Sequence, residues 1–137
     1  MTTKEYLKQI ELLDCKIKHK EAQLRELEAR IMQAGGMDYE HERVSTSPKG
    51  DRLADDVIRM VELKEQISAE RAAYFKKKQE IVNRIHRMDE AAYIDVLIKR
   101  YVELKGFEVI AEEMHYSISY TYELHRKALH AFALLKA

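Results

Sequence analysis

The chain has 137 residues, of which 35% are charged, and it contains only one proline and four glycines. This composition is typical of a mostly helical protein, and the length leaves no room for a large enzyme core. Basic and acidic side chains number 24 each, so the composition does not indicate a strongly basic domain for nucleic acid. The one cysteine, Cys15, excludes an internal disulfide and a cysteine-based zinc site.

The N-terminal residues lead directly into an amphipathic segment rather than into the apolar core of a signal peptide. The longest uninterrupted apolar run, residues 131–135, is far too short to cross a bilayer. We therefore expect a cytoplasmic protein that does not contact membranes.

Apolar side chains recur three and four residues apart through the first part of the chain, which is the pattern of a helix that packs along a partner helix. Thr2 and Glu5 are spaced as a capping box at its start, and Lys20 interrupts the series. Glycines and a Ser-Thr-Ser-Pro run then predict a loop at about 34–50. The series is Tyr6, Ile10, Leu13, Ile17, Leu24, Leu27 and Ile31.

A second apolar series follows the loop, with basic residues at the intervening positions of the same stripe. We expect the two helices to form a long antiparallel, coiled-coil-like hairpin over residues 1–88. The charged positions suggest a partly open groove that a second copy or a partner protein would close. The apolar series is Leu53, Val57, Met60, Ile67, Tyr74, Ile81, Ile85 and Met88, and the basic residues are Lys64, Arg71 and Lys78.

Residues 89–137 are expected to form a separate small domain. Asp89 is predicted to cap a helix over residues 90–105, and Gly106 is predicted to end that helix in the left-handed conformation. The core of the domain should be closed by Phe107, Ile110, Met114, Leu124 and Phe132.

Within this domain, residues 110–132 have the spacing of a helix-turn-helix. Ile110, Ala111 and Met114 share one face of a short helix, and Ser117 follows a turn where its side chain can cap the next helix. A short helix, a tight turn and a second helix with an exposed N-terminal half is the arrangement that places a recognition helix in the major groove. The predicted buried stripe of the second helix is Thr121, Leu124, Ala128 and Phe132.

This segment resembles region 4 of the sigma-70 family, and the match extends upstream through residues 96–101. The whole chain resembles small phage and prophage proteins with sigma-like helix-turn-helix domains, which are described as late transcription regulators. His115 stands where that family usually has glycine, so a histidine must adopt the left-handed turn conformation. The matching positions are Ile110, Ala111, Met114, Ser117, Leu124, Ala128 and Leu129.

The resemblance implies a non-enzymatic, sequence-specific DNA-binding transcription regulator whose recognition helix spans about 117–132. The expected base-reading residues are Ser119, Tyr120, Tyr122 and Glu123. The expected phosphate contacts are Ser117, Arg126, Lys127 and Lys99. Sigma factors present arginines and polar residues on the recognition helix, so the promoter sequence that they read does not transfer to this chain. The residues at those positions here are Ile118, Ser119, Tyr120, Tyr122 and Glu123.

Two alternatives come from other classes of protein. One is a DNA-packaging component resembling small terminase subunits, which would assemble into a ring. The other is a protein-interaction module, in which Ile118, Tyr120 and Tyr122 form an apolar docking face.

The expected partners are double-stranded DNA, RNA polymerase or another transcription protein, and a second copy bound through the hairpin. No cofactor, metal or catalytic residue is expected.

Overall fold

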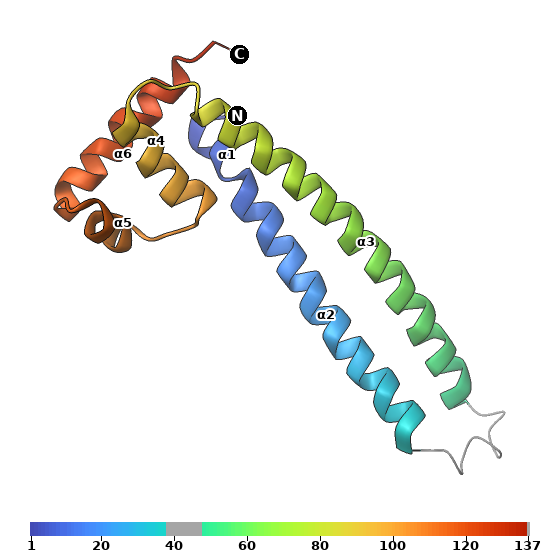
Figure 1. Cartoon of the computed structure of the whole chain (residues 1–137). Helices are drawn as coiled ribbons and strands as arrows, with labels where there is room; N and C mark the ends of the chain where they lie inside the picture. Colours follow the sequence, from blue (N-terminus) through green and yellow to red (C-terminus); the bar gives the residue numbers. More distant parts are fainter. Residues whose placement is uncertain (38–47, 137) are drawn as a thin grey trace. The chain divides into compact units, whose positions relative to one another are not determined.

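The computed structural model describes residues 1–37 and 48–136, with side chains for 1–34 and 51–136. The described residues are helical with short connections, which confirms the expected fold class (Figure 1). The elements are α1 (Thr3–Leu7), α2 (Gln9–Met37), α3 (Pro48–Ile85), α4 (Ala91–Leu97), the π-helical η1 (Ile98–Val102), α5 (Phe107–Met114) and α6 (Ile118–Ala133).

The first helix begins with the predicted capping box. The backbone amide of Glu5 donates to the Thr2 hydroxyl over 3.2 Å, and the Thr2 amide donates to the Glu5 carboxylate over 3.1 Å. Two amides that the helix cannot satisfy internally therefore have partners. The helix is interrupted once, at Lys8, where α1 ends and α2 begins.

The predicted loop is shorter at both edges than the sequence suggested. The helix α2 continues to Met37 through both glycines of its last turn, and α3 begins at Pro48. A helical glycine costs only about 1 kcal/mol, and proline is well tolerated at a first helical position. The remaining loop positions, 38–47, lie outside the described residues.

By its contacts, the chain divides into two compact units: Met1–Asp14 with Ala73–Ala137, and Cys15–Ala72. In the second unit, α2 and α3 run antiparallel, as predicted (Figure 1). Its buried apolar residues are Ile17, Leu27, Leu63 and Ile67.

The polar residues of this stripe differ from the prediction. Lys64 and Arg71 are exposed, whereas Leu63 is buried and Glu70 is partly buried in their place. At each of these turns, two neighbouring residues fit the apolar spacing about equally well, and the spacing alone does not decide which of them faces the partner helix. Lys20, which interrupts the first series, forms an ion pair with Glu70 at 2.6 Å.

A second ion pair of this unit involves an acidic side chain that periodicity alone did not single out. Asp56 is 9% exposed and accepts two hydrogen bonds from Arg30, at 3.1 Å from Nε and 2.7 Å from Nη2. This two-point geometry holds a guanidinium group and a carboxylate in one relative orientation. Arg30 of α2 and Asp56 of α3 therefore join the two helices, as Lys20 and Glu70 do.

The other unit has one apolar core, to which the N-terminal helix and the end of α3 contribute together with the C-terminal helices. The predicted Ile110, Leu124 and Phe132 are buried in it, and Phe107 and Met114 pack against it. The expected domain boundary after residue 88 implies that residues 89–137 fold on their own. This boundary stays a prediction. The buried members are Leu7, Ile10, Ile81, Ile85, Met88, Val96, Leu97, Tyr101, Ile110, Leu124, Ala128 and Phe132.

Aromatic and basic side chains connect the two ends of the chain inside this unit. The rings of Tyr6 and Phe132 are 5.9 Å apart, and the Arg84 guanidinium lies 4.9 Å and 5.1 Å from their centres. The Tyr6 hydroxyl donates to Glu80 over 2.9 Å. Cation–π contacts of this kind hold α1 and α3 against α6.

The segment between α3 and α5 departs from the prediction at both ends. Glu90, not Asp89, precedes α4 in an extended conformation, and its side chain makes no capping hydrogen bond. The left-handed residue is Leu104, at φ 58°, whereas Gly106 has φ −74° and begins α5 as its N-cap. The helical segment ends in the π-helical turn η1, and the amide of Lys105 donates to the carbonyl of Lys99 over 2.9 Å, so the reversal falls at Leu104, two residues before the glycine.

Among the described residues, no helix is both long enough and apolar enough to span a membrane.

Candidate nucleic-acid interface

The turn between α5 and α6 has the conformation that the sequence required. His115 adopts φ 60° and ψ 40°, the left-handed region, directly after α5. The next amide, that of Tyr116, donates to the carbonyl of Ala111 over 2.9 Å. This hydrogen bond closes the end of α5, and histidine tolerates the left-handed conformation that glycine adopts more easily.

Ser117 begins the second helix, as predicted. It is extended at φ −69° and ψ 158°, and its hydroxyl accepts a hydrogen bond from the Tyr120 amide over 3.1 Å. The Thr121 hydroxyl donates to the Ser117 carbonyl over 2.8 Å, and Thr121 is fully buried. The cap and the buried threonine together set the angle at which α6 leaves the turn.

The buried stripe of α6 contains all four predicted residues, Thr121, Leu124, Ala128 and Phe132. It also contains His125, which is 6% exposed and was not among the predicted members of the stripe. The helix α6 packs against α4, α5 and α1, and Arg84 of α3 lies over its Phe132 ring, so one face of the helix is covered.

His125 is held in the interior by aromatic neighbours. Its Nε2 is hydrogen-bonded to the Tyr101 hydroxyl at 2.7 Å, and its ring packs against those of Tyr101 and Phe107. Burial lowers the pKa of His125 to about 4, and the positive charges of Lys4 and Arg100 act in the same direction. Burial also raises the pKa of Tyr101. Both groups are therefore neutral near pH 7, which permits them to lie in an apolar core.

The opposite face of α6 is exposed, and most of the predicted DNA-contacting residues lie on it. At 3.6 residues per turn, Ser119, Glu123, Arg126 and His130 lie opposite the buried stripe, with Tyr120 and Lys127 on one flank. All six side chains are exposed. The structure thus brings together the predicted base-reading Ser119, Tyr120 and Glu123 with the predicted phosphate contacts Arg126 and Lys127.

The aromatic residues at the start of α6 differ in how they are held. The ring of Tyr120 makes an edge-to-face contact with Tyr116, with centres 4.7 Å apart. The ring of Tyr122 lies 4.5 Å from Phe107, the first residue of α5. Tyr120 is therefore braced by the turn and remains on the exposed face, whereas Tyr122 packs across the joint between the two helices with half its surface exposed.

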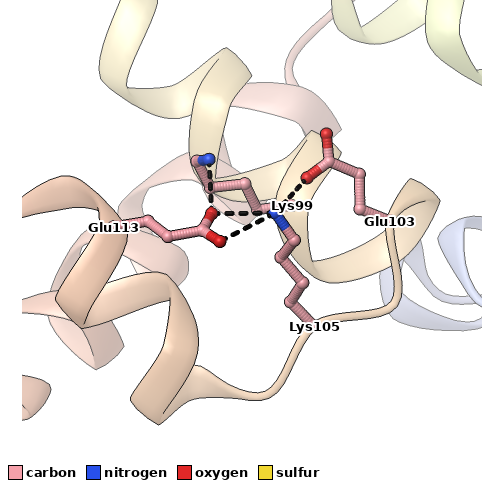
Figure 2. Close-up of polar contacts among 4 residues, drawn as sticks. All are labelled: Lys99, Glu103, Lys105 and Glu113. Atoms are coloured by element: carbon pink, nitrogen blue, oxygen red, sulfur yellow. Dashed lines mark hydrogen bonds and ion pairs between the residues drawn. The ribbon is translucent and has the colours of Figure 1, made fainter.

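Lys99, predicted to contact phosphate, is engaged within the protein. Its ammonium group donates to Glu113 of α5 over 2.7 Å, and Lys105 donates to the same carboxylate and pairs with Glu103 (Figure 2). Hydrogen bonds from Lys105 and Lys99 lower the pKa of Glu113, and those to Glu113 and Glu103 raise the pKa of Lys105. This four-residue cluster connects η1, the following connection and α5.

Arg100, from the stretch that resembles the sigma family, has a structural position. Its Nη1 donates to the carbonyl of Lys105 over 3.0 Å, and its guanidinium lies 4.5 Å from the centre of the Phe107 ring. Arg100 therefore holds the connection before α5 in place. No local sequence pattern predicts that Arg100 contacts Phe107.

The charges around the exposed face are balanced. Residues 93–137 contain six basic and six acidic side chains. On α5, Glu108 and Glu112 are exposed, and on α6, Glu123 pairs with Lys127 at 3.5 Å. Arg126 is the exposed arginine of α6, so positive charge is concentrated at a few positions rather than spread over the module.

Comparisons with known proteins identify a family without assigning an activity. No curated protein matches the chain, and no solved structure matches it. The model of one family, described as a protein of unknown function (DUF1492), matches residues 37–133, a range that contains α3 to α6. Because this match covers most of the chain, the protein belongs to the DUF1492 family.

Proposed function

We propose that this protein is a sequence-specific DNA-binding transcription regulator that places α6 in the major groove of duplex DNA. The observation that carries the proposal is the local geometry of α5, the left-handed His115 and the Ser117-capped α6. That geometry leaves the N-terminal half of α6 exposed while its other face is packed. The resemblance to sigma region 4 and to phage late regulators supports the same function.

Each exposed residue has a role in this proposal. Ser119 and Glu123 lie at the centre of the face and would contact base edges. Arg126, Lys127 and the Ser117 hydroxyl would contact phosphates and set the register of the helix. Lys99 would contribute only after leaving Glu113, because its ammonium group is engaged there.

The balanced charge predicts a particular kind of binding. Nonspecific affinity for DNA comes mainly from neutralised phosphates, and few unpaired cations lie on this face. We therefore expect a modest salt dependence and affinity that depends strongly on base contacts or on pairing of two copies. In the proposal, the N-terminal helical hairpin, residues 1–88, provides that second interaction, with another copy of the chain or with RNA polymerase.

The test is a selection from a random-sequence duplex pool with the full-length protein, followed by affinity measurements over a salt series and by light scattering. We expect an enriched sequence whose binding weakens with salt. Arg126→Ala should reduce the salt slope by about one, as for loss of one phosphate contact. Arg59→Ala, the same change at an exposed position of α3, is the matched control. Absence of any enriched or salt-sensitive binding would reject the proposal.

The cluster of Lys99, Glu103, Lys105 and Glu113 provides a second test, in which a substitution should strengthen DNA binding rather than weaken it. Glu113→Gln removes the carboxylate that Lys99 and Lys105 share, so the Lys99 ammonium group is released, Lys105 keeps its ion pair with Glu103, and the net charge rises by one. If the module binds DNA, this substitution should strengthen binding and steepen its salt dependence. Glu62→Gln, at an exposed position of α3, gives the same charge change as a control.

A protein-docking role is the second candidate, and one observation favours it. The rings of Tyr116 and Tyr120, which are 40% and 45% exposed, contact each other at the start of α6, and Ile118 of the same turn is 46% exposed. Exposed apolar side chains gathered in one place often indicate a protein interface. The selection experiment separates the two roles, because a docking module would enrich no DNA sequence at any salt concentration.

A further inference from the structure

We infer that the recognition face reads thymine methyl groups, and that the preferred site of this protein is therefore rich in A·T pairs at the contacted positions. The inference rests on the proposed DNA binding and specifies its substrate. It depends on two features of the first two turns of α6: the kinds of side chain that are exposed there, and the kinds that are absent.

The first two turns lack the side chains that read purines with two hydrogen bonds. Residues 118–124 contain no arginine, lysine, asparagine or glutamine. Arginine or lysine recognises guanine through O6 and N7, and asparagine or glutamine recognises adenine through N6 and N7. The first cation of α6 is Arg126, in the third turn, where phosphate contact is the expected role. Recognition of guanine by two-point contacts is therefore excluded for these turns.

Apolar atoms are presented in place of those side chains. Ile118 and Tyr120 are each almost half exposed, and they lie on opposite flanks of Ser119 at the tip of the helix. The ring of Tyr120 makes an edge-to-face contact with the ring of Tyr116, with centres 4.7 Å apart, and leaves part of its apolar surface exposed. The 5-methyl group of thymine is the apolar group on the major-groove edge of the base pairs. Ile118 and Tyr120 match that group chemically.

The polar residues of the face are compatible with the same base pair. Glu123 is exposed and lies 3.5 Å from the ammonium group of Lys127, and a carboxylate offers only hydrogen-bond acceptors. A carboxylate is repelled by the O6 and N7 acceptors of guanine and can accept from the exocyclic amine of adenine or cytosine. An A·T pair offers both groups: the adenine amine can donate to Glu123, and the thymine methyl can contact Ile118 or Tyr120.

The experiment uses the enriched duplex from the selection and replaces its thymines by deoxyuridine one at a time. This change removes only the methyl group and leaves base pairing unchanged. A methyl contact contributes about 0.8 kcal/mol, so each contacted thymine should weaken binding about three- to fivefold when replaced. Ile118→Ala should abolish the penalty at one or more positions, because the methyl then has no apolar partner. Ile58→Ala, at an exposed isoleucine of α3, should leave the penalty unchanged.

Four results would overturn the inference in distinguishable ways. Enrichment of a sequence with guanines at the contacted positions, or equal affinity for the thymine and deoxyuridine duplexes, rejects methyl reading while DNA binding stands. A deoxyuridine penalty that is identical in wild type, Ile118→Ala and Tyr120→Ala assigns the effect to DNA shape and rejects these residues as the readers. No binding to any duplex rejects the proposed function and the inference together.

Discussion

At the scale of single residues, the core of the C-terminal module contains an ionisable group that must stay neutral. His125 is buried against Tyr101 and Phe107, and its pKa is lowered to about 4, chiefly by burial. The unfolded chain binds this proton near pH 6.5, the ordinary value. Between these two values, the unfolded state holds more protons than the folded state, so acidification favours unfolding.

We predict that the free energy of unfolding decreases as the pH falls from about 6.5 to 4, by at most about 3 kcal/mol from this one group. His125→Gln, which keeps a polar group near the Tyr101 hydroxyl without a titrating ring, should remove that part of the decrease. Denaturant unfolding at several pH values measures it. The matched control is His130→Gln, at an exposed position of the same helix. Identical pH dependence in wild type and His125→Gln would contradict the prediction.

A second prediction at this scale concerns Gly106. The position has an ordinary extended conformation, and an added Cβ would meet no atom within 4 Å. It is also the N-cap of α5, where no side chain accepts a hydrogen bond. We expect Gly106→Ser to raise the stability by about 0.5–1 kcal/mol, by capping the helix and by restricting the unfolded chain. Denaturant unfolding measures this gain, and a destabilised Gly106→Ser variant would show that the glycine itself is required.

At the scale of elements, the pairing of α2 with α3 depends on polar contacts as well as on apolar ones. Lys20 and Glu70 are both partly buried and form an ion pair at 2.6 Å, yet Oε2 of Glu70 is buried and has no hydrogen-bond partner. Such a pair defines the register of two helices more than it stabilises them, because both charges lose water.

We predict that Lys20→Met alone destabilises the protein by about 1–2 kcal/mol, because the partly buried Glu70 carboxylate then lacks its cation. The double variant Lys20→Leu with Glu70→Leu should be at least as stable as wild type, since neither charge remains to be desolvated. Thermal and denaturant unfolding measure both effects. Lys16→Met, at an exposed position of α2, is the control for the loss of a lysine. Equal destabilisation by the single and double variants would contradict this explanation.

At the scale of the whole molecule, the C-terminal helices share their core with residues from the start of the chain and from the end of α3. Leu7 and Ile10 are fully buried in the same cluster as Leu97, Leu124 and Phe132. An isolated segment 89–137 would expose the side of this cluster that those residues cover, at a cost of about 25 cal/mol for each Å² of apolar surface.

We therefore predict that Leu7→Ala destabilises the protein by about 2–5 kcal/mol, the usual cost of a buried leucine. The variant should lose hydrogen-exchange protection in α4 and α6 as well as in α1. Leu12→Ala, at a leucine of α2 that is 55% exposed, should leave that protection unchanged. If protection of α4 and α6 were unaffected by Leu7→Ala, residues 89–137 would fold independently, as the expected domain boundary implies.

Features that depend on neighbouring residues could be predicted from the sequence. The helical class, the two long helices, the Thr2 capping box, the left-handed His115 and the Ser117 cap all follow from residues within one or two turns. The exposed face of α6 also follows, because the helical period assigns each residue to a side. The face of α6 on which the predicted DNA-contacting residues lie could therefore be located from the sequence, whereas their contacts with DNA stay a prediction.

Features that depend on partners far apart in the sequence were decided only by the tertiary structure. Contacts between elements placed Lys99 on Glu113, Tyr122 on Phe107 and His125 beside Tyr101. They also selected Leu63 and Glu70 over their neighbours in α3, and added Leu7 to the core of the C-terminal helices. The physical reason is that periodicity and capping are local properties, whereas the choice of a packing or ion-pairing partner depends on which distant elements fold against each other.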